Sequence, residues 1–362
     1  MTSSTRDELR IAIIACGALT ELFYAPALTE LGRKRRLKVA SLIDPNPTRL
    51  AAIQPLFPGS IGGASLADLP ADIDLAIVAS PAGFHAEQTA ALLRRGMHVF
   101  CEKPMARSAS ECDVMVEAAR ETGRLLAVGH FKRFFPATRQ IKDLVENQTF
   151  GRLIDFHFFD GGKFGWPAQS RTLFDRAAGG GGVLIDIGVH ALDLALWWFG
   201  EPAEVACADD AMGGVEANVA VTLRYPNGAT GTLIASRDVD TPNRYVMRFE
   251  RGWVAWNPID ANHIELGWGE HYALSAATHQ TQSQMRLPIA GGLAPSRHQA
   301  FMLQIDAMLD AMQGKGAVGV SGEEGRRVMA LIDRCYASST LIDMPWLGPA
   351  EREKAMELRC SP

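Results

Sequence analysis

The chain has 362 residues, of which 47% are hydrophobic and 21% are charged. This composition excludes a disordered chain, a collagen-like chain and a disulfide-rich miniprotein, and the length predicts two domains of about 150 residues each. The 36 basic and 41 acidic residues leave a formal net charge of −5, so bulk charge does not favour nucleic acid as a partner.

The ends and the cysteines favour a cytoplasmic protein with no membrane partner. Residues 1–10 lack the apolar stretch of a signal peptide, and the chain has no run of about 18 uncharged apolar residues. The six cysteines form no C-x-x-C pair and no metal-finger spacing, and most of them lie in apolar runs. We therefore expect reduced, buried thiols.

Short apolar runs alternate with amphipathic stretches in the first third of the chain. The expected strands are residues 11–15, 37–43, 74–80, 98–101 and 125–128, and the expected helices are residues 18–32, 84–95 and 109–122. Pro26 must kink or split the first helix. This alternation predicts βαβ units and a doubly wound parallel sheet, an α/β Rossmann domain over residues 1–130.

A basic run, residues 33–38, follows the first expected helix. Such a run is compatible with a nucleic-acid patch. Because it lies between a helix and a strand, where cations suit the helix dipole, we favour a solvated helix end.

The pattern changes near Gly151. Strand-like runs follow at residues 152–159, 204–208, 217–224, 230–236 and 245–250, with helices at 183–199, 297–312 and 323–339. Asn227-Gly228 predicts a hairpin between two of these strands. We expect an α+β domain with an open, mainly antiparallel sheet over residues 131–340, followed by a C-terminal tail over 341–362.

The turn after the first strand is a degenerate dinucleotide-binding fingerprint. In the stretch Ala15 to Thr20, only Gly17 of the three G-x-G-x-x-G glycines remains. Asp44 ends the second strand, where a carboxylate accepts hydrogen bonds from ribose hydroxyls and repels a 2′-phosphate, so NAD is favoured over NADP. An ordinary strand–turn–helix is the alternative. The candidate cofactor-binding residues are Gly17, Ala18, Leu19, Thr20 and Asp44.

Two further groups follow the next strands of the expected parallel sheet. They are Ser80-Pro81 with His85, and Glu102-Lys103-Pro104. Carboxyl ends of strands form the ligand-binding edge of open α/β sheets. Lys103 beside a cationic nicotinamide would have a lowered pKa suited to proton transfer, although a surface lysine in a turn is the alternative. Ser80, Pro81, His85, Glu102 and Lys103 are therefore added to the cofactor site.

The second half carries a carboxylate and an imidazole on an apolar helix. Residues 179–182 are four glycines, and Asp186 and His190 follow four residues apart, so they share a helix face. Burying this pair is costly unless the two groups serve each other or a ligand. Acid–base catalysis is favoured over a metal pair, for which no third ligand is apparent, and over a satisfied core pair.

Together these motifs resemble the Gfo/Idh/MocA family, the relatives of glucose–fructose oxidoreductase and inositol dehydrogenase. The resemblance covers most of the chain, and its most specific parts are the E-K-P triplet at 102–104 and the helix start G-G-V-L-x-D-x-G-x-H-x-x-D at 181–193. It departs at Ala15 and Thr20, which replace the first and third fingerprint glycines; the alanine methyl would tighten the turn or weaken cofactor affinity.

The resemblance implies an NAD-dependent enzyme that transfers a hydride to or from a carbinol carbon of a sugar or inositol. It implies that Lys103 and His190 flank that carbon, that Asp186 holds hydroxyls, and that the protein is a homodimer or homotetramer. For substrate contacts we add Arg133, Lys163, Trp166 and, less directly, Arg171 or Arg176. An NAD-dependent glycoside-cleaving enzyme and a non-catalytic ligand sensor remain the competing hypotheses.

Overall fold

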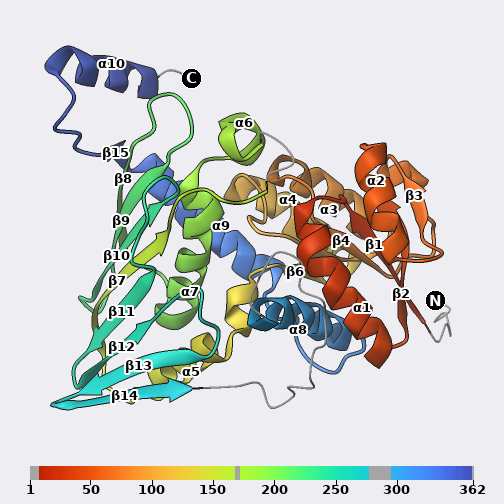
Figure 1. Ribbon diagram of the computed structural model, residues 1–362, viewed down its shortest axis with the longest axis horizontal. Coiled ribbons are helices and arrows are strands. Elements are labelled where there is room, and N and C mark those ends of the chain that lie inside the picture. The colour runs from red at the N-terminus through yellow and green to blue at the C-terminus, as the bar shows by residue number, and fades with distance from the viewer. Residues whose placement is uncertain (1–7, 168–171, 277–294, 361–362) are drawn as a thin grey trace. The chain divides into compact units, whose positions relative to one another are not determined.

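The computed structural model describes residues 8–167, 172–276 and 295–360. The chain forms two compact units, which are taken one at a time (Figure 1). The first consists of Met1–Phe134 with Gln282–Arg326, and the second of Phe135–Thr281 with Arg327–Pro362.

A six-stranded parallel sheet forms the centre of the first unit. Its spatial order is β3-β2-β1-β4-β5-β6, which confirms the predicted doubly wound sheet. β2 and β3 are added on one side of β1, and β4 to β6 are added on the other side. The boundary between β1 and β4 is therefore the switch point at which such sheets bind ligands. The bounds are β1 Leu9–Ile14, β2 Leu37–Ile43, β3 Ile61–Gly63, β4 Leu75–Val78, β5 His98–Cys101 and β6 Leu126–Val128.

Helices of the first unit pack in two pairs. α1 packs against α8, and α3 packs against α4 (Figure 1). Their bounds are α1 Ala25–Lys34, α2 Pro47–Ile53, α3 His85–Arg94, α4 Ala109–Thr122 and α8 Pro295–Met312. The first helical segment is divided near Pro26, as predicted, into a π-helical turn over Thr20–Tyr24 and the helix α1, which has the proline in its first turn. Although α8 comes late in the chain, Phe301 on it stacks on Phe23 with ring centroids 4.5 Å apart.

The basic run at the end of α1 makes ion pairs within the first unit. Arg33 and Lys34 lie 3.0 and 3.3 Å from the carboxylate of Glu30, and Arg35 pairs with Asp310 of α8 at 2.8 Å. These contacts, together with the position at a helix end, favour a structural role for the run.

A nine-stranded mixed sheet forms the second unit, in the order β14-β13-β12-β11-β7-β10-β9-β8-β15. β7 with β10 and β8 with β15 are parallel, and the other pairs are antiparallel. The predicted hairpin at residues 227–228 joins β9 to β10. The bounds are β7 Leu153–Gly161, β8 Glu204–Asp209, β9 Asn218–Arg224, β10 Thr230–Ser236, β11 Arg244–Phe249, β12 Gly252–Trp256, β13 His263–Trp268, β14 His271–Ala276 and β15 Ser339–Leu341.

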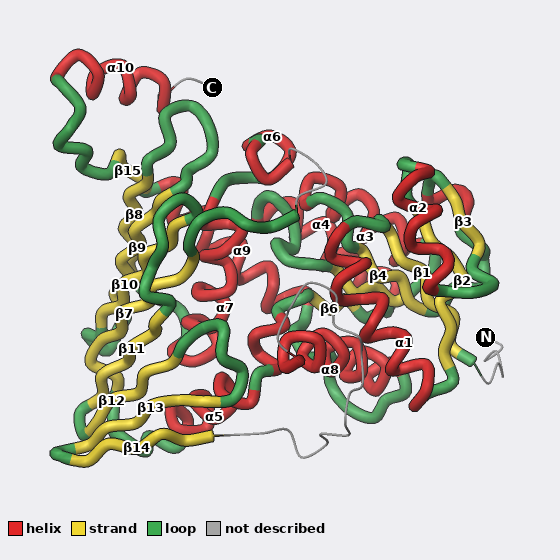
Figure 2. The backbone as a smooth tube through the Cα atoms, in the orientation of Figure 1, coloured by secondary structure: helices red, strands yellow, loops and turns green. Residues whose placement is uncertain are grey.

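Helices cover one face of this sheet. Figure 2 shows α5 and α7 beside it, and α5 packs against α7. On the other face, His157 and Arg248 are exposed and Ile234 is 41% exposed, as expected for an open sheet. The bounds are α5 Pro136–Glu146, α6 Arg176–Gly179, α7 Val189–Phe199, α9 Gly322–Ala337 and α10 Pro349–Cys360.

The segment around α7 is unusually apolar. Within the described residues, Arg176–Phe199 alone has the length and composition of a membrane-crossing helix, and 78% of its most apolar window is buried inside the protein. A core helix of a globular protein passes the same test, and the burial favours that explanation.

Candidate active site

The turn after β1 holds an alanine in a backbone conformation that favours glycine. Ala15 has φ +80°, and it occupies the place of the first fingerprint glycine. Its N–H donates to the carbonyl of Ile43 at 2.7 Å, and the Thr20 hydroxyl donates to its carbonyl at 2.7 Å. Thr20, at the third glycine position, therefore secures the turn, while the Ala15 methyl costs about 1 to 2 kcal/mol of strain.

We expect Ala15→Gly to stabilise the protein. Relief of the strain outweighs the extra freedom of glycine in the unfolded chain by about 1 kcal/mol, which raises Tm by a few degrees. Calorimetry measures the change. As a matched control, Ala51→Gly in the exposed face of α2 lowers stability by about 1 kcal/mol. An Ala15→Gly variant less stable than the parent contradicts the strain.

Gly17 and Asp44 lie at the same turn and fit a dinucleotide. A Cβ built on Gly17 meets nothing within 4 Å, so its backbone faces open space into which a pyrophosphate fits. The two Asp44 oxygens accept hydrogen bonds from the N–H groups of Cys16 and Asn46, at 2.7 and 2.8 Å. A carboxylate has about four lone-pair sites, so two remain for ribose hydroxyls.

His85 braces two loops at the end of the sheet. Its ring is 1% exposed, with Nδ1 2.9 Å from the Pro104 carbonyl oxygen and Nε2 2.7 Å from the Ser80 carbonyl oxygen. Burial lowers the pKa of His85, and the two carbonyl contacts oppose that shift. Both ring nitrogens thus face the protein backbone, and His85 acts on the predicted cofactor loops by holding the segments of Ser80-Pro81 and Lys103-Pro104 together.

Glu102 lies directly before Lys103 and is 3% exposed. The Tyr24 hydroxyl donates to one of its oxygens, and the Lys103 N–H donates to the other at 3.0 Å. A Cβ on Gly129 would lie 2.9 Å from the same carboxylate, so a larger residue there would displace it. Burial raises the pKa of Glu102 from 4.5 to about 7, and Tyr24 and Lys103 oppose the shift.

We expect Glu102→Gln to change how stability depends on pH. Between pH 4.5 and about 7 the folded state holds a proton that the unfolded state has lost, so this group lowers stability as pH rises through that window, by roughly 3 kcal/mol in total. Urea unfolding from pH 4 to 8 measures the free energy of unfolding of the variant and of the parent. His85 contributes the opposite pH dependence to both proteins, so its contribution cancels when the two are subtracted. Glu121→Gln, on the surface, is the control and leaves the profile unchanged; a Glu102→Gln profile parallel to the parent's refutes the shifted pKa.

In the second unit, Asp186 forms an ion pair that the sequence did not indicate. Its Oδ2 lies 3.1 Å from an Nη of Arg237, which is 5% exposed and follows β10. The same guanidinium donates to the Leu173 carbonyl at 2.9 Å and lies over the rings of Phe164 and Phe174, 5.9 and 5.7 Å from their centroids. Arg237 therefore joins Asp186 to the segment after β7.

The helix that carries Asp186 and His190 begins differently from the prediction. An α-helix was expected from residue 183, but Leu184–Gly188 is π-helical and α7 follows it. Asp186 lies in the π turn, and His190 lies in the first turn of α7 and is buried. Single π turns in helices are frequent at functional sites. In the part of the chain that the structure describes, no group of three or more His, Cys, Asp or Glu side chains is arranged to hold a metal ion.

The other expected substrate residues are distributed over both units. Arg133, in the first unit, is buried and forms an ion pair with Glu324. Lys163 is exposed and Trp166 is 36% exposed, both in the segment after β7, while Arg176 stacks over Tyr336. Arg171 lies outside the described residues. Lys103 belongs to the first unit, and Asp186 and His190 belong to the second.

A parallel sheet with a dinucleotide turn at its switch point, followed by a unit built on a mixed sheet, is the architecture expected of a two-unit nucleotide-dependent oxidoreductase. The model of the oxidoreductase family with an NAD-binding Rossmann fold matches residues 9–130, and the model of the GFO/IDH/MocA C-terminal domain matches residues 138–255. The chain belongs to the GFO/IDH/MocA family, and its first unit contains the NAD-binding Rossmann domain of that family.

Similar proteins share most of the chain's length. A D-glucoside 3-dehydrogenase of Escherichia coli (strain K12) is 27% identical, covering 93% of this chain and 97% of its own. A levoglucosan dehydrogenase of Pseudarthrobacter phenanthrenivorans is 25% identical, covering 78% and 83%. Among solved structures, an aldose-aldose oxidoreductase from Caulobacter crescentus, complexed with glycerol, is 25% identical with a TM-score of 0.78, covering 91% and 97%.

Proposed function

We propose that this chain transfers a hydride between NAD and a carbinol carbon of a sugar or polyol. The observation that carries the proposal is Lys103 at the carboxyl end of β5, on the sheet edge to which Gly17 and Asp44 also contribute. Family membership supports it, as do the names of the two relatives that align over most of the chain, both of which are sugar dehydrogenases.

Each side chain has one part in the proposed reaction. When bound, NAD accepts the hydride, with its electron pair, at C4 of the nicotinamide. The imidazole of His190 takes the hydroxyl proton as the C–O bond becomes a carbonyl, and the Lys103 ammonium stabilises the developing alkoxide. Asp186, which lies 3.1 Å from Arg237, accepts hydrogen bonds from a neighbouring hydroxyl. In the reverse direction His190 returns the proton.

The names of the two long relatives support a narrower substrate class. A glucoside and levoglucosan both have a substituted anomeric carbon, so a ring carbinol elsewhere in the sugar is oxidised. We therefore infer a glycoside or anhydro sugar as substrate of this chain. The exposed ring of Trp166 suits the C–H face of a sugar, and exposed Lys163, three residues earlier in the chain, suits a hydroxyl.

A dehydrogenase screen tests this proposal. Methyl glucosides, levoglucosan, free aldoses and inositols are incubated with NAD, and absorbance near ~340 nm is followed. We expect NADH to accumulate fastest with a glycoside or anhydro sugar. Equal rates with free aldoses refute the proposed substrate class. NAD binding without turnover of any sugar refutes the proposed enzymatic activity and supports the ligand-sensor hypothesis.

The glycoside-cleaving alternative has one observation in its favour. A relative from Escherichia coli (strain K12), 28% identical over 48% of this chain and 49% of its own length, is a 2,7-anhydro-N-acetylneuraminate hydratase, a name that describes no net oxidation. In the same screen, release of the aglycone without net NADH supports cleavage by transient oxidation and contradicts the dehydrogenase.

Asp44 underlies the proposed preference for NAD over NADP. We expect Asp44→Ser to lower kcat/KM with NAD and to raise the NADP-to-NAD ratio of kcat/KM at least about tenfold, because a carboxylate that repels the 2′-phosphate is removed. Arg49, whose Nε lies 3.0 Å from the Cys16 carbonyl at this turn, remains to meet the phosphate. Asp72→Ser, at the surface, is the control. An unchanged ratio removes Asp44 from cofactor selection.

The proposal also covers the oligomeric state of the protein and the cellular compartment in which it works. We infer a cytoplasmic homodimer or homotetramer formed through the open face of the nine-stranded sheet. Exposed Ile234 on that face supports the assembly. Five buried cysteines that form no disulfide, namely Cys16, Cys101, Cys112, Cys207 and Cys335, support a reducing compartment. Sedimentation of Ile234→Lys against the parent tests the interface: the variant should dissociate to smaller species, and an unchanged assembly excludes this face.

A further inference from the structure

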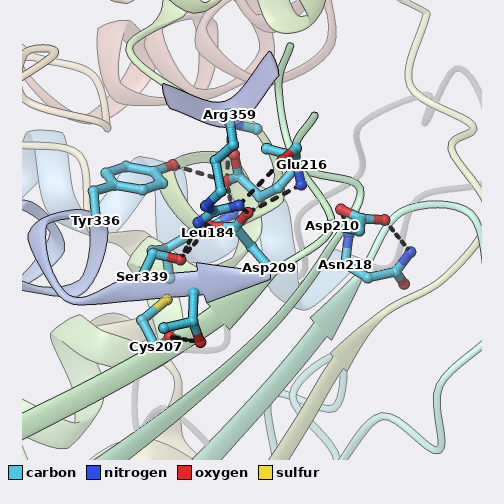
Figure 3. Close-up of polar contacts among 12 residues, drawn as sticks. Leu184, Cys207, Asp209, Asp210, Glu216, Asn218, Tyr336, Ser339 and Arg359 are labelled. Carbon is cyan, nitrogen blue, oxygen red and sulfur yellow. Dashed lines mark hydrogen bonds and ion pairs between the residues drawn. The ribbon is translucent and has the colours of Figure 1, made fainter. Parts of the chain in front are cut away.

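The π-helical turn Leu184–Gly188, which carries Asp186 and leads into α7, is capped by a side chain from a distant part of the second unit. Val183, the residue before Leu184–Gly188, contributes no side-chain cap. Instead Glu216, in the connection between β8 and β9, is 0% exposed and reaches the free N–H groups (Figure 3). Its Oε1 accepts from Gly182 and Leu184, each at 3.0 Å, and its own carbonyl accepts from Val183 at 2.9 Å.

Tyr336 of α9 fixes the carboxylate from the other side. Its hydroxyl donates to Oε1 of Glu216 at 2.8 Å, and the Arg176 guanidinium lies 5.3 Å from the centre of its ring. Burial and the neighbouring Glu216 raise the pKa of Tyr336, so the phenol keeps its proton and remains a donor. A buried carboxylate satisfied by backbone N–H groups at a helix start is favourable, because the helix dipole also attracts it.

This arrangement accounts for two of the four glycines at residues 179–182. A Cβ on Gly182 would lie 2.0 Å from the Glu216 carbonyl oxygen, and a Cβ on Gly181 would lie 2.0 Å from the Tyr336 hydroxyl. Real Cβ atoms do not approach so closely. The glycines therefore allow the chain to press against residues 216 and 336, and the cap holds the backbone two residues before Asp186.

We propose that Glu216, with Tyr336, is a positioning residue that sets the place of Asp186 and His190 for proton transfer. The inference rests on the proposed function, since it assigns a position to groups whose chemistry is proposed above. A misplacement of a reacting group by about 1 Å costs about 100-fold in rate. The carboxylate is needed because both of its oxygens accept from the Gly182 N–H, each at 3.0 Å, and a glutamine amide would turn a donor toward that N–H.

Kinetics of Glu216→Gln and Tyr336→Phe test the assignment in the full-length enzyme. We expect Glu216→Gln to lower kcat by about 10- to 100-fold and to displace the limb of the pH profile of kcat/KM that reports His190. The Kd of NADH, bound by the first unit, stays unchanged. Tyr336→Phe lowers kcat by about fivefold, and the double variant is no worse than Glu216→Gln because both act through one carboxylate.

Asp209→Asn is the matched control, since Asp209 is also a buried carboxylate of the second unit but binds Arg359 and Ser339 (Figure 3). It is expected to lower Tm and to keep kcat near that of the parent. If Glu216→Gln lowers Tm by a similar amount with kcat and pH profile unchanged, Glu216 is only structural and the proposal fails. Should Glu216→Gln fail to fold, Tyr336→Phe decides by the same two readouts.

A measurement without turnover separates this proposal from the proposed function. The His190 imidazole resonances are assigned by comparison with His190→Ala and titrated by NMR in the parent and in Glu216→Gln or Tyr336→Phe. A changed shift and titration midpoint of His190 support the positioning role even if no sugar is oxidised. Superimposable titrations overturn it even if the parent is an active dehydrogenase.

Discussion

Lys103→Met is expected to lower kcat by about 10²- to 10⁴-fold and to leave NAD binding nearly intact. The change keeps much of the side chain's length while it removes the ammonium that stabilises the alkoxide, and that charge matters most in the transition state. The neighbouring Glu102 remains held by Tyr24, so the turn is preserved. Steady-state kinetics give kcat, and a fluorescence titration with NADH gives Kd.

Lys38→Met is a suitable control in the same unit, because Lys38 lies on β2 and pairs only loosely with Glu8 at 3.5 Å. Its kcat should equal the parent's. Turnover of Lys103→Met within a few-fold of the parent removes Lys103 from the mechanism. A loss confined to NADH affinity assigns it to cofactor binding alone.

His190→Ala is expected to lower kcat by a similar 10²- to 10⁴-fold, since the imidazole that takes the carbinol proton is removed. The acidic limb of the pH profile of kcat/KM should disappear, and added imidazole should restore part of the rate. The side chain is buried, so its removal also leaves a cavity.

His190→Asn separates these two effects because it fills more of the space. It should recover Tm relative to His190→Ala and should still lack the activity. If His190→Asn recovers activity over His190→Ala in proportion to its recovery of Tm, then lost packing and not lost proton transfer explains the lower kcat. A pH profile that keeps its acidic limb without His190 also excludes the residue as the base.

Long apolar runs made the first unit predictable. Buried parallel strands such as Ile11 to Ile14 contain few polar residues, and their spacing with helices leaves few topologies. β3 was not predicted because it is short, contains two glycines and is mostly exposed. The strands β12 to β14 were not predicted either. They follow one another at short intervals, and β14 is largely exposed, which weakens the alternation of apolar and polar residues along it. The packing of α8 on α1 joins segments far apart in the chain, and no local pattern encodes it.

The residues found only in the structure share one property, since their partners are remote in the sequence. Arg237 meets Asp186 across 51 residues, and Glu216 meets Gly182 across 34. Spacing rules for helices and turns reach about four residues, so such pairs carry no local signal. The local motifs were accessible for the opposite reason, because Gly17, Asp44 and Lys103 each follow a strand that the apolar pattern marks. The positive φ of Ala15 could not be predicted from that pattern.

Transfer of deuterium from a labelled substrate tests the central claim most directly. A methyl glucoside labelled with deuterium at the carbon that the screen identifies is incubated with NAD, and the NADH formed is examined by mass spectrometry. Direct hydride transfer predicts one deuterium in the nicotinamide ring and a slower rate than with the unlabelled sugar. NADH without deuterium, or a sugar consumed while NAD stays unreduced, would contradict the account.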